Sequence, residues 1–452
     1  MANTYLTRTF SGAGNRKKWT WSAWVKKHQE SGSSTYNTPL FGSAGGSYDT
    51  ISFLTTPNSP KLFMSIGGSF ERQTNAFFRD FFGWYHIVIT FDSNQSTATD
   101  RLKVYVNGVQ QSSFSDNTNG SQDADSNINK AEAHQIGKQQ TLSRYGDFSM
   151  SHVHFCDGYA YAASDFGQTD SVTGEWSIKT APSVSYGTNG FFILKDGNSV
   201  TDQSPNSNNW SVGGGTLTKT EDNPSNLYCN FNKLQQTNGS TGFSNGNTFF
   251  TSSAQWLGVN GTLAATSGKY YAEFKVQSNA WGVGVADVDS DANRTDYLSS
   301  SNNGYQSKYS GGKQIFLNGS TIIAQENNST VINNAGMGNT SFANNDIVMA
   351  ALDLDNNNLF FGKNGTWLRG ATESEIEAGT STNATFSGTS FNDKFWTWSV
   401  TTENTNMYAN FGNGYFGTTA VSSAGTNASN NGIFEYDVPA GFTALSTKGL
   451  NL

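Results

Sequence analysis

The chain has 452 residues, a formal net charge of −8 at pH 7 and only 14% charged residues. This length allows about two or three domains, each with a core of its own. The basic clusters that stand out are two short ones, Arg16-Lys17-Lys18 and Lys26-Lys27. The sequence therefore lacks the broad positive charge of a nucleic-acid-binding protein.

Short apolar runs alternate with clusters of Gly, Asn, Ser and Thr along the whole chain. This pattern predicts an all-β protein with many turns. No stretch approaches the ~18 to 20 apolar residues that a membrane-spanning helix needs. The N-terminus lacks a basic-then-apolar signal peptide, so we expect synthesis in a cytoplasm and no membrane insertion. Cys156 and Cys229 are too few for a disulfide framework, and we expect two reduced, half-buried thiols.

In the first half, residues 19–25 (WTWSAWV) alternate in a way that gives both faces of a strand aromatic cover. Further strands are expected at this spacing, which is typical of a two-sheet sandwich or jelly roll. They cover residues 38–42, 50–54, 61–66, 84–91, 101–106, 134–136 and 148–156. Asn107-Gly108 is expected to form a tight turn, because both residues tolerate positive φ.

Several segments in this half carry a resemblance to a known family. They are residues 5–25 (YLTRTFSGAGNRKKWTWSAWV), 84–109, 133–137 (AHQIG), 153–158 (VHFCDG), 164–167, 186–191 and 202–210 (DQSPNSNNW). In order and spacing they resemble the laminin-G-like version of the concanavalin-A-like domain that is common in structural proteins of tailed bacteriophages. The resemblance implies a β-sandwich in a virion protein.

The second half repeats the order of strand, polar turn and strand that is expected in the first half. Residues 346–367 (DIVMAALDLDNNNLFFGKNGTW) form its centre, with tight turns expected at 355–358 and at Lys363-Asn364-Gly365. Together with residues 269–276, 281–288 and 395–400, this stretch resembles a SPRY domain, which is another concanavalin-like sandwich. One short helix is expected at 373–378, capped by Thr372 and ended by Gly379.

These readings predict two concanavalin-like β-sandwich (jelly-roll) domains in series. A laminin-G/concanavalin-A-like sandwich is expected at 1–195 and a SPRY-like sandwich at 248–452. An Asn-rich, packed connector is expected at 196–247, because its many Asn residues favour local turns while Trp210 and Leu227-Tyr228-Cys229 require burial.

Carboxylates are the first candidates for chemistry, since glycosidases need two of them a few ångströms apart. Glu273 stands alone on its strand, and Asp353 and Asp355 have the right spacing, but Asp355 opens an Asn-rich turn. Neither arrangement favours a hydrolytic pair. With no other nucleophile and base set in the sequence, we expect a protein that is not an enzyme.

Metal-binding patterns are incomplete. Asp287, Asp289 and Asp291 match the early spacing of a calcium loop, but the later Gly and Glu positions of such a loop are missing. A second incomplete calcium-loop pattern has the same early spacing and consists of Asp123, Asp125, Asn127 and Asn129. His152 and His154 have a spacing that zinc sites use, without an evident third ligand, and solvent-facing histidines are the simpler expectation. Calcium therefore stays an open alternative, and no other cofactor is expected.

Exposed aromatic residues are the remaining functional signal. Trp281, Tyr297, Tyr305 and Tyr309 lie in or beside polar loops of the second half, and such rings suit contact with a sugar face or a protein partner. We expect the end of the second sandwich that holds these aromatic residues to contact the ligand, and we expect the Arg16–Lys18 turn of the first sandwich to face the virion.

The resemblance then implies a non-catalytic tail-fibre or tail-tip adhesin that binds a host surface glycan or protein. A capsid-surface decoration protein is the alternative, and a carbohydrate-active enzyme is a third. Other virion proteins are the expected partners. A homo-oligomer, with a trimer as the first guess, would multiply weak single-site binding.

Overall fold

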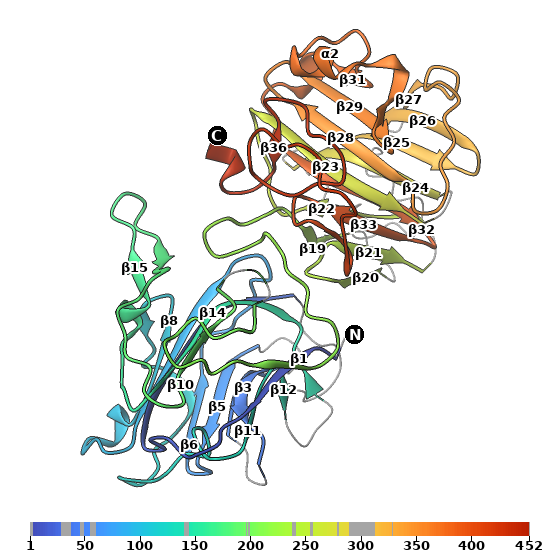
Figure 1. Cartoon of the computed structure of the whole chain (residues 1–452). Helices are drawn as coiled ribbons and strands as arrows, with labels where there is room; N and C mark the ends of the chain where they lie inside the picture. The colour runs from blue at the N-terminus through green and yellow to red at the C-terminus, as the bar shows by residue number, and fades with distance from the viewer. Residues whose placement is uncertain are drawn as a thin grey trace. The chain divides into compact units, whose positions relative to one another are not determined.

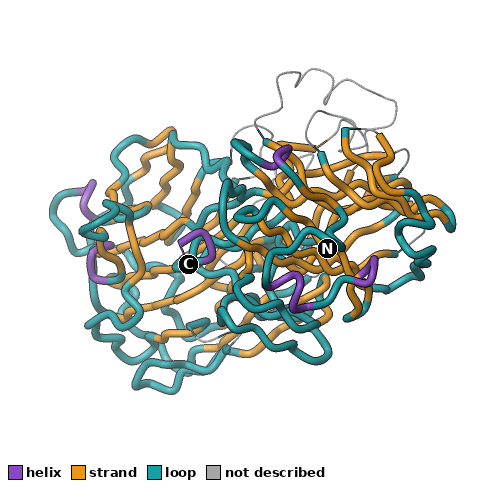
Figure 2. Tube along the Cα trace, turned by 90° about the horizontal axis from the view of Figure 1, so that it is seen from above, coloured by secondary structure: helices purple, strands orange, loops and turns teal. Residues whose placement is uncertain are grey.

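The chain folds into two compact units, which are described separately (Figure 1). The computed structural model describes residues 3–28, 38–45, 49–54, 60–139, 144–195, 197, 199–236, 241–253, 256–277, 280–288, 312–327 and 329–451. The first unit comprises residues 1–219 and 223–225, and the second comprises 220–222 and 226–452. Strands and loops make up most of both, as expected for an all-β protein (Figure 2).

Two antiparallel sheets form the first unit. The eight-stranded sheet has the order β10-β6-β5-β4-β3-β11-β1-β18, with strands β1 (Tyr5–Thr9), β3 (Thr38–Ser43), β4 (Thr50–Phe53), β5 (Leu62–Ile66), β6 (Phe70–Thr74), β10 (Phe114–Thr118), β11 (Ala133–Ile136) and β18 (Ser211–Gly214). The six-stranded sheet has the order β17-β14-β2-β7-β8-β9, with strands β2 (Lys18–Lys27), β7 (Tyr85–Asp92), β8 (Leu102–Val106), β9 (Val109–Gln110), β14 (Phe148–Asp157) and β17 (Phe191–Ile193). A small pair, β12 (Lys138–Gln139) and β13 (Arg144–Tyr145), and the short helix η1 (Ala98–Asp100) complete this framework.

Strand β2 explains how the sheets acquire a core. Its alternate residues Trp19, Trp21, Ala23 and Val25 are buried in the main apolar cluster of the unit. On the opposite face, Trp24 stacks on His86 of β7 at a ring-centroid distance of 4.8 Å. The expectation that both faces of this strand carry aromatic cover is confirmed.

The outer face of the six-stranded sheet is covered by residues 158–190, here named the strap segment. It contains η2 (Ala163–Asp165) and the pair β15 (Gly167–Thr169) and β16 (Trp176–Ile178). Thr20 and Thr90 of the sheet donate their hydroxyls to the carbonyls of Tyr159 and Tyr161. Side chains of the strap therefore exclude water from a face that would otherwise be exposed.

The second unit also contains two large sheets. The seven-stranded sheet has the order β19-β22-β32-β24-β25-β26-β27, with strands β19 (Phe231–Gln236), β22 (Trp256–Gly261), β24 (Ala280–Asp287), β25 (Lys313–Asn318), β26 (Thr321–Glu326), β27 (Ser329–Ile332) and β32 (Trp396–Glu403). The nine-stranded sheet follows the path β20-β21-β33-β23-β28-β29-β30, with β31 on β29 and β36 on β23. Its strands are β20 (Thr241–Ser244), β21 (Phe249–Ser252), β23 (Lys269–Val276), β28 (Ile347–Asp353), β29 (Asn358–Lys363), β30 (Thr366–Trp367), β31 (Phe386–Ser387), β33 (Asn406–Asn410) and β36 (Thr443–Ala444). The pair β34 (Tyr415–Phe416) and β35 (Thr419–Ala420) and the helical turns η4 (Leu368–Gly370), η5 (Thr389–Phe391) and η6 (Gly449–Asn451) lie outside these sheets.

The tight turns expected between antiparallel strands are present in both units. Asn107-Gly108 joins β8 to β9 and Asn364-Gly365 joins β29 to β30, and all four residues have positive φ. Such turns match the twist of the strands that they connect. The expected short helix is α2 (Glu373–Glu377), where Thr372 accepts a hydrogen bond from the Glu375 backbone and Gly379 follows at φ 71°.

The segment expected as a separate connector, 196–247, is instead divided between the units. β18 pairs with β1 of the first unit, whereas β19 pairs with β22 and β20 with β21 of the second. Its Asn-rich composition reflects turns between these strands. The sequence predicted a connector here because short strands with many polar residues show no strong alternation of apolar and polar side chains.

Candidate functional site

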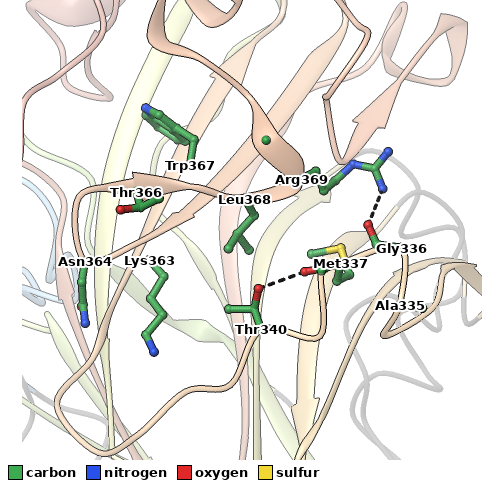
Figure 3. Close-up of a pocket in the computed structure, with 12 residues that line it drawn as sticks. Ala335, Gly336, Met337, Thr340, Lys363, Asn364, Thr366, Trp367, Leu368 and Arg369 are labelled. Atoms are coloured by element: carbon green, nitrogen blue, oxygen red, sulfur yellow. Dashed lines mark hydrogen bonds between the residues drawn. The ribbon is translucent and has the colours of Figure 1, made fainter.

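A pocket of about 580 Å³ lies in the second unit beside the β29–β30 hairpin (Figure 3). Two stretches of chain line it, the turn that follows β27 and the stretch that runs from the end of β29 to η4. The lining residues are Ala335, Gly336, Met337, Gly338, Thr340, Lys363, Asn364, Thr366, Trp367, Leu368, Arg369 and Gly370. This set is named the β29–β30 pocket.

Local sequence holds both walls in place. In the first wall, Asn333 accepts a hydrogen bond from the Gly336 backbone, and Thr340 donates its hydroxyl to the Met337 carbonyl at 2.9 Å. Met337 is fully buried and anchors this turn. In the second wall, the amide of Asn364 bonds to the Ile347 backbone and to the Asp346 carboxylate, which fixes the hairpin turn.

The last residue of β30 and the first residue of η4 project to opposite sides of the chain. Leu368 points toward Thr340 and Met337, whereas Trp367 lies on the opposite side of the strand (Figure 3). Trp367 is half-buried and forms a T-shaped pair with Tyr271, with ring centroids 6.4 Å apart. The floor is therefore apolar, and the rim is formed by hydroxyl, amide and cationic groups.

Among the described residues, the lining contains two cations and no carboxylate. Lys363 pairs with Asp346 at 2.9 Å and donates to the Ser341 carbonyl at 2.7 Å, so its charge is offset. Arg369 donates from Nη1 to the Gly336 carbonyl at 3.0 Å (Figure 3). It forms no ion pair with any residue that the structure describes.

The backbone of Arg369 is also unusual, because its φ of 61° is left-handed. For a residue other than Gly this conformation costs roughly 1–2 kcal/mol. Its Nε is buried and has no hydrogen-bond partner among the described residues. An incompletely bonded guanidinium at the rim can donate hydrogen bonds to an anionic or carbonyl-bearing ligand.

Of the aromatic residues expected at a contact surface, Trp281 is placed elsewhere. Its side chain is 0% exposed and packs edge-on against Phe342 with ring centroids 5.0 Å apart. The expectation of an exposed Trp281 was wrong, because β24 lies inside the seven-stranded sheet and turns this ring into the core. Tyr297, Tyr305 and Tyr309 lie outside the described residues.

The expected metal ligands are not assembled in the part of the chain that the structure describes. Asp287 is buried and lies 3.5 Å from the Lys394 ammonium, while Asp289 and Asp291 lie outside the described residues. In the first unit, Asp125 pairs with Arg16 at 3.0 Å. No group of three or more His, Cys, Asp or Glu side chains suited to a metal occurs among the described residues.

Asn127 and Asn129, which were also considered for calcium, are used inside the first unit. Asn127 donates to the buried carboxylate of Asp49 at 3.0 Å. Asn129 donates to Asp157 at 2.6 Å and accepts from Asn189 at 2.8 Å. Their amides are therefore part of internal networks that fasten loops to one another.

The histidines of β14 are not the solvent-facing pair that the sequence suggested. The strand register shifts between Ser151 and His154, and His152 has a φ of 48°. His154 is buried and stacks on Phe192 with ring centroids 3.9 Å apart. Its Nδ1 forms a hydrogen bond with the Tyr186 hydroxyl at 2.9 Å. Burial lowers the pKa of His154 well below its usual value.

Glu273 is a buried anchor of the second unit. Its carboxylate accepts hydrogen bonds from the Tyr271 hydroxyl, the Asn410 amide and the backbone N–H groups of Glu435 and Tyr436, at 2.8–3.1 Å. Burial raises the pKa of Glu273 to about 7, although these hydrogen bonds act in the opposite direction. With 0% of the residue exposed, a substrate has no access to this carboxylate in the folded state.

Asp353 and Asp355 have local structural partners. Asp353 pairs with Lys269 at 3.0 Å and accepts from the Asn356 backbone. Asp355 accepts from the Gly268 backbone at 2.7 Å. The two carboxylates thus hold the β28–β29 turn.

Among the described residues neither Cys156 nor Cys229 forms a disulfide, and both are buried, where half-buried thiols were expected. Burial raises the pKa of the Cys156 thiol far above its usual range, with the Asp165 carboxylate acting in the same direction. The neutral thiol is a poor nucleophile.

The sequence reading missed the pocket itself. Lys363 and Asn364 were noted as turn residues only, and Thr366 and Arg369 were not singled out. Their signal is weak, because nothing in the sequence places the 335–340 turn next to them.

Comparison with known families bears on the first unit. Residues 2–165 match the laminin-G model of the Concanavalin A-like lectin/glucanases superfamily. The first unit thus has a concanavalin-like lectin fold. Sequence comparison found no curated protein that matches the chain. In the described part of the chain, no helix has the length and apolar character to cross a membrane.

Three solved structures illustrate the likenesses in shape. The SPRY domain of human HERC1 is 14% identical, with 40% of this chain and 96% of that chain covered and a TM-score of 0.28. The SAP-like pentraxin of Limulus polyphemus is 12% identical, with 48% and 91% covered and a TM-score of 0.30. Domain 4 of a GH43 extracellular arabinanase from Geobacillus stearothermophilus, solved with arabinotriose, is 18% identical, with 33% and 65% covered and a TM-score of 0.24. These scores are too low to transfer a ligand or an activity to this chain.

Proposed function

We propose that the chain is a non-catalytic binding protein that takes a surface glycan into the β29–β30 pocket. The observation that supports this most directly is the pocket's composition, with an apolar floor at Leu368 next to the fully buried Met337 and a rim of hydroxyl, amide and cationic groups. Sugar rings present apolar C–H faces and polar edges, so a site for them needs both kinds of surface. The lectin-type fold of the first unit is consistent with a binding role.

The finer part of the proposal concerns where the protein works. The segments quoted from residues 5–25 and 202–210 resemble structural proteins of tailed bacteriophages. We therefore assign the chain to a virion, as a short tail adhesin for a host surface glycan. Several copies per appendage, in a trimer at first guess, would convert weak binding into adhesion. Decoration of a capsid surface is the alternative.

Filling the pocket tests the binding site. Thr366 is exposed at the rim and pairs with Lys363 across the hairpin. Thr366→Trp should reduce binding to an array of bacterial capsular and lipopolysaccharide glycans by about tenfold or more, because the new side chain occupies ligand space. Thr419→Trp is the matched control, since Thr419 is an exposed residue of the two-residue strand β35 in the same unit.

Both variants should keep the thermal midpoint of the wild-type protein. Equal binding by the Thr366→Trp protein and the wild type would remove the pocket from the proposal. Binding of no glycan at all would reject glycan recognition. Release of reducing ends from a bound glycan would contradict the non-catalytic part.

A further inference from the structure

We infer that the ligand of the β29–β30 pocket is an acidic saccharide whose carboxylate binds Arg369, with Lys363 as a second cation. This inference rests on the proposed function and specifies the ligand class. It concerns what the pocket selects, which the fold alone does not determine.

The local charge differs from that of the whole chain. The chain carries a net charge of −8, yet the lining residues that the structure describes include two cations and no carboxylate. Asp346 offsets Lys363, and this leaves Arg369 as the cation of the lining without an acidic partner among the described residues. A neutral ligand would leave that charge uncompensated at the rim.

The hydrogen bonding of Arg369 is incomplete. A guanidinium has five N–H donors, and the structure gives one of them an acceptor, the Gly336 carbonyl. Its Nε lies buried without an acceptor in the described part of the chain. A buried donor without a partner costs roughly 1–3 kcal/mol. A carboxylate has two oxygens that match two parallel N–H groups of arginine, so it can use donors that the protein leaves unpaired once the side chain adjusts.

Lys363 is held in place for a supporting role. Its ammonium donates to Asp346 and to the Ser341 carbonyl, and it lies 5.2 Å from the centre of the Phe342 ring. These contacts use two of its three N–H groups. The third can reach a ligand oxygen without breaking the ion pair.

The rest of the lining favours a saccharide over a compact anion. The Thr340 hydroxyl donates to Met337, so its oxygen keeps acceptor capacity for a sugar hydroxyl. Thr366 adds an exposed hydroxyl. Phosphate would satisfy Arg369, but it would leave the apolar floor at Leu368 uncovered.

The test compares acids with their own neutral esters. Oligosaccharides that contain galacturonate, glucuronate or N-acetylneuraminate are measured beside the same compounds with each carboxyl methylated, using the full chain and calorimetry. At least one acid should bind about tenfold more tightly than its ester, and less tightly as salt rises. Arg369→Gln should remove most of this preference, while Arg369→Lys keeps part of it.

Lys448→Gln is the matched control, because Lys448 is an exposed cation of the same unit that the pocket does not include. It removes the same charge and should leave the preference unchanged. Arg369→Gln and Arg369→Lys give up at most one side-chain hydrogen bond, the one to the Gly336 carbonyl. All three variants should therefore stay folded, with thermal midpoints close to that of the wild type.

Each outcome is decisive. If the glycans whose binding is lost in Thr366→Trp are neutral, or bind equally as acid and ester, the inference is wrong and the proposed function stands. If no glycan shows binding that depends on Thr366, both are wrong. If inorganic phosphate binds as tightly as every acidic saccharide, the site is a simple anion site and the inference fails.

Discussion

At the scale of single residues, polar side chains of the types found in active sites form internal hydrogen bonds that hold loops in place. Asp202 accepts hydrogen bonds from the backbones of Phe192, Ser204 and Asn208. Asn431 is fully buried and joins Tyr228 to Thr443. Carboxylates and amides that accept several N–H groups replace a regular ladder where the chain turns. A polar cluster in this sequence is therefore weak evidence for catalysis.

Trp281 gives a prediction at this scale. Trp281→Ala should lower the free energy of unfolding of the second unit by about 3–5 kcal/mol, because it empties a core position against Phe342. Trp281→Phe is the control, since it keeps most of the packing and removes an indole N–H that has no partner among the described residues. Urea denaturation measures both. An unchanged midpoint in Trp281→Ala together with lost glycan binding would return this residue to the surface.

At the scale of elements, the strap segment depends on neutral histidines. His86 accepts a hydrogen bond from the Trp176 indole at Nδ1 and bonds to the Ser22 hydroxyl at Nε2, both at 2.9 Å. Burial lowers the pKa of His86 to about 3. Protonation would place an N–H against the indole N–H of the strap, so it must break this contact.

Acid should therefore loosen the strap segment. Because the folded-state pKa of His86 lies below the usual 6.5, its contribution to stability is complete above about pH 6.5 and is lost as the pH falls toward 3. Hydrogen exchange, corrected for its intrinsic pH dependence, should show lower protection in residues 158–190 at about pH 5 than at about pH 7.

His86→Gln should reduce that acid effect, because glutamine does not titrate. His134 provides the matched control. Burial lowers its pKa to about 4, but it lies on β11 of the other sheet, and its ring bonds to the backbones of Asn129 and Glu132. His134→Gln should leave the loosening of the strap unchanged. Equal acid sensitivity in His86→Gln and wild type would show that other groups control the strap.

At the scale of the whole molecule, each unit has an apolar core of its own. A division near residue 240 would cut through the second unit, since β19 pairs with β22 and Phe231 is fully buried. The chain instead divides near residue 222. Independent folding is thus expected for a fragment that keeps residues 226–236.

Two fragments test this division. Residues 220–452 should unfold cooperatively, whereas residues 241–452 should melt at a lower temperature because they lose Tyr228, Phe231 and all of β19. The loss of one buried Phe alone costs about 3–5 kcal/mol. Calorimetry of both fragments provides the measurement. Identical melting temperatures would mean that β19 contributes little, and an unfolded 220–452 fragment would mean that the units depend on each other.

The fold class and much of the local structure follow from residue patterns along the chain. Alternation in 19–25 indicated a strand with two covered faces, and Asn107-Gly108 and Asn364-Gly365 indicated their turns. The box at Thr372 and Glu375 indicated the helix. These features depend on backbone preferences of residues that are near one another in the chain, so they can be read without knowing the fold.

The burial of Trp281, the internal use of Glu273 and His154, and the position of the pocket depend on contacts between distant segments. Whether a ring on a strand faces solvent depends on which sheet neighbours it receives, and β24 receives β25 and β32 from far along the chain. Likewise, Arg369 meets Gly336 only because η4 and the turn after β27 come together in space. Contacts between distant segments leave no periodic signal in either segment, and for that reason the candidate site could not be predicted from the sequence.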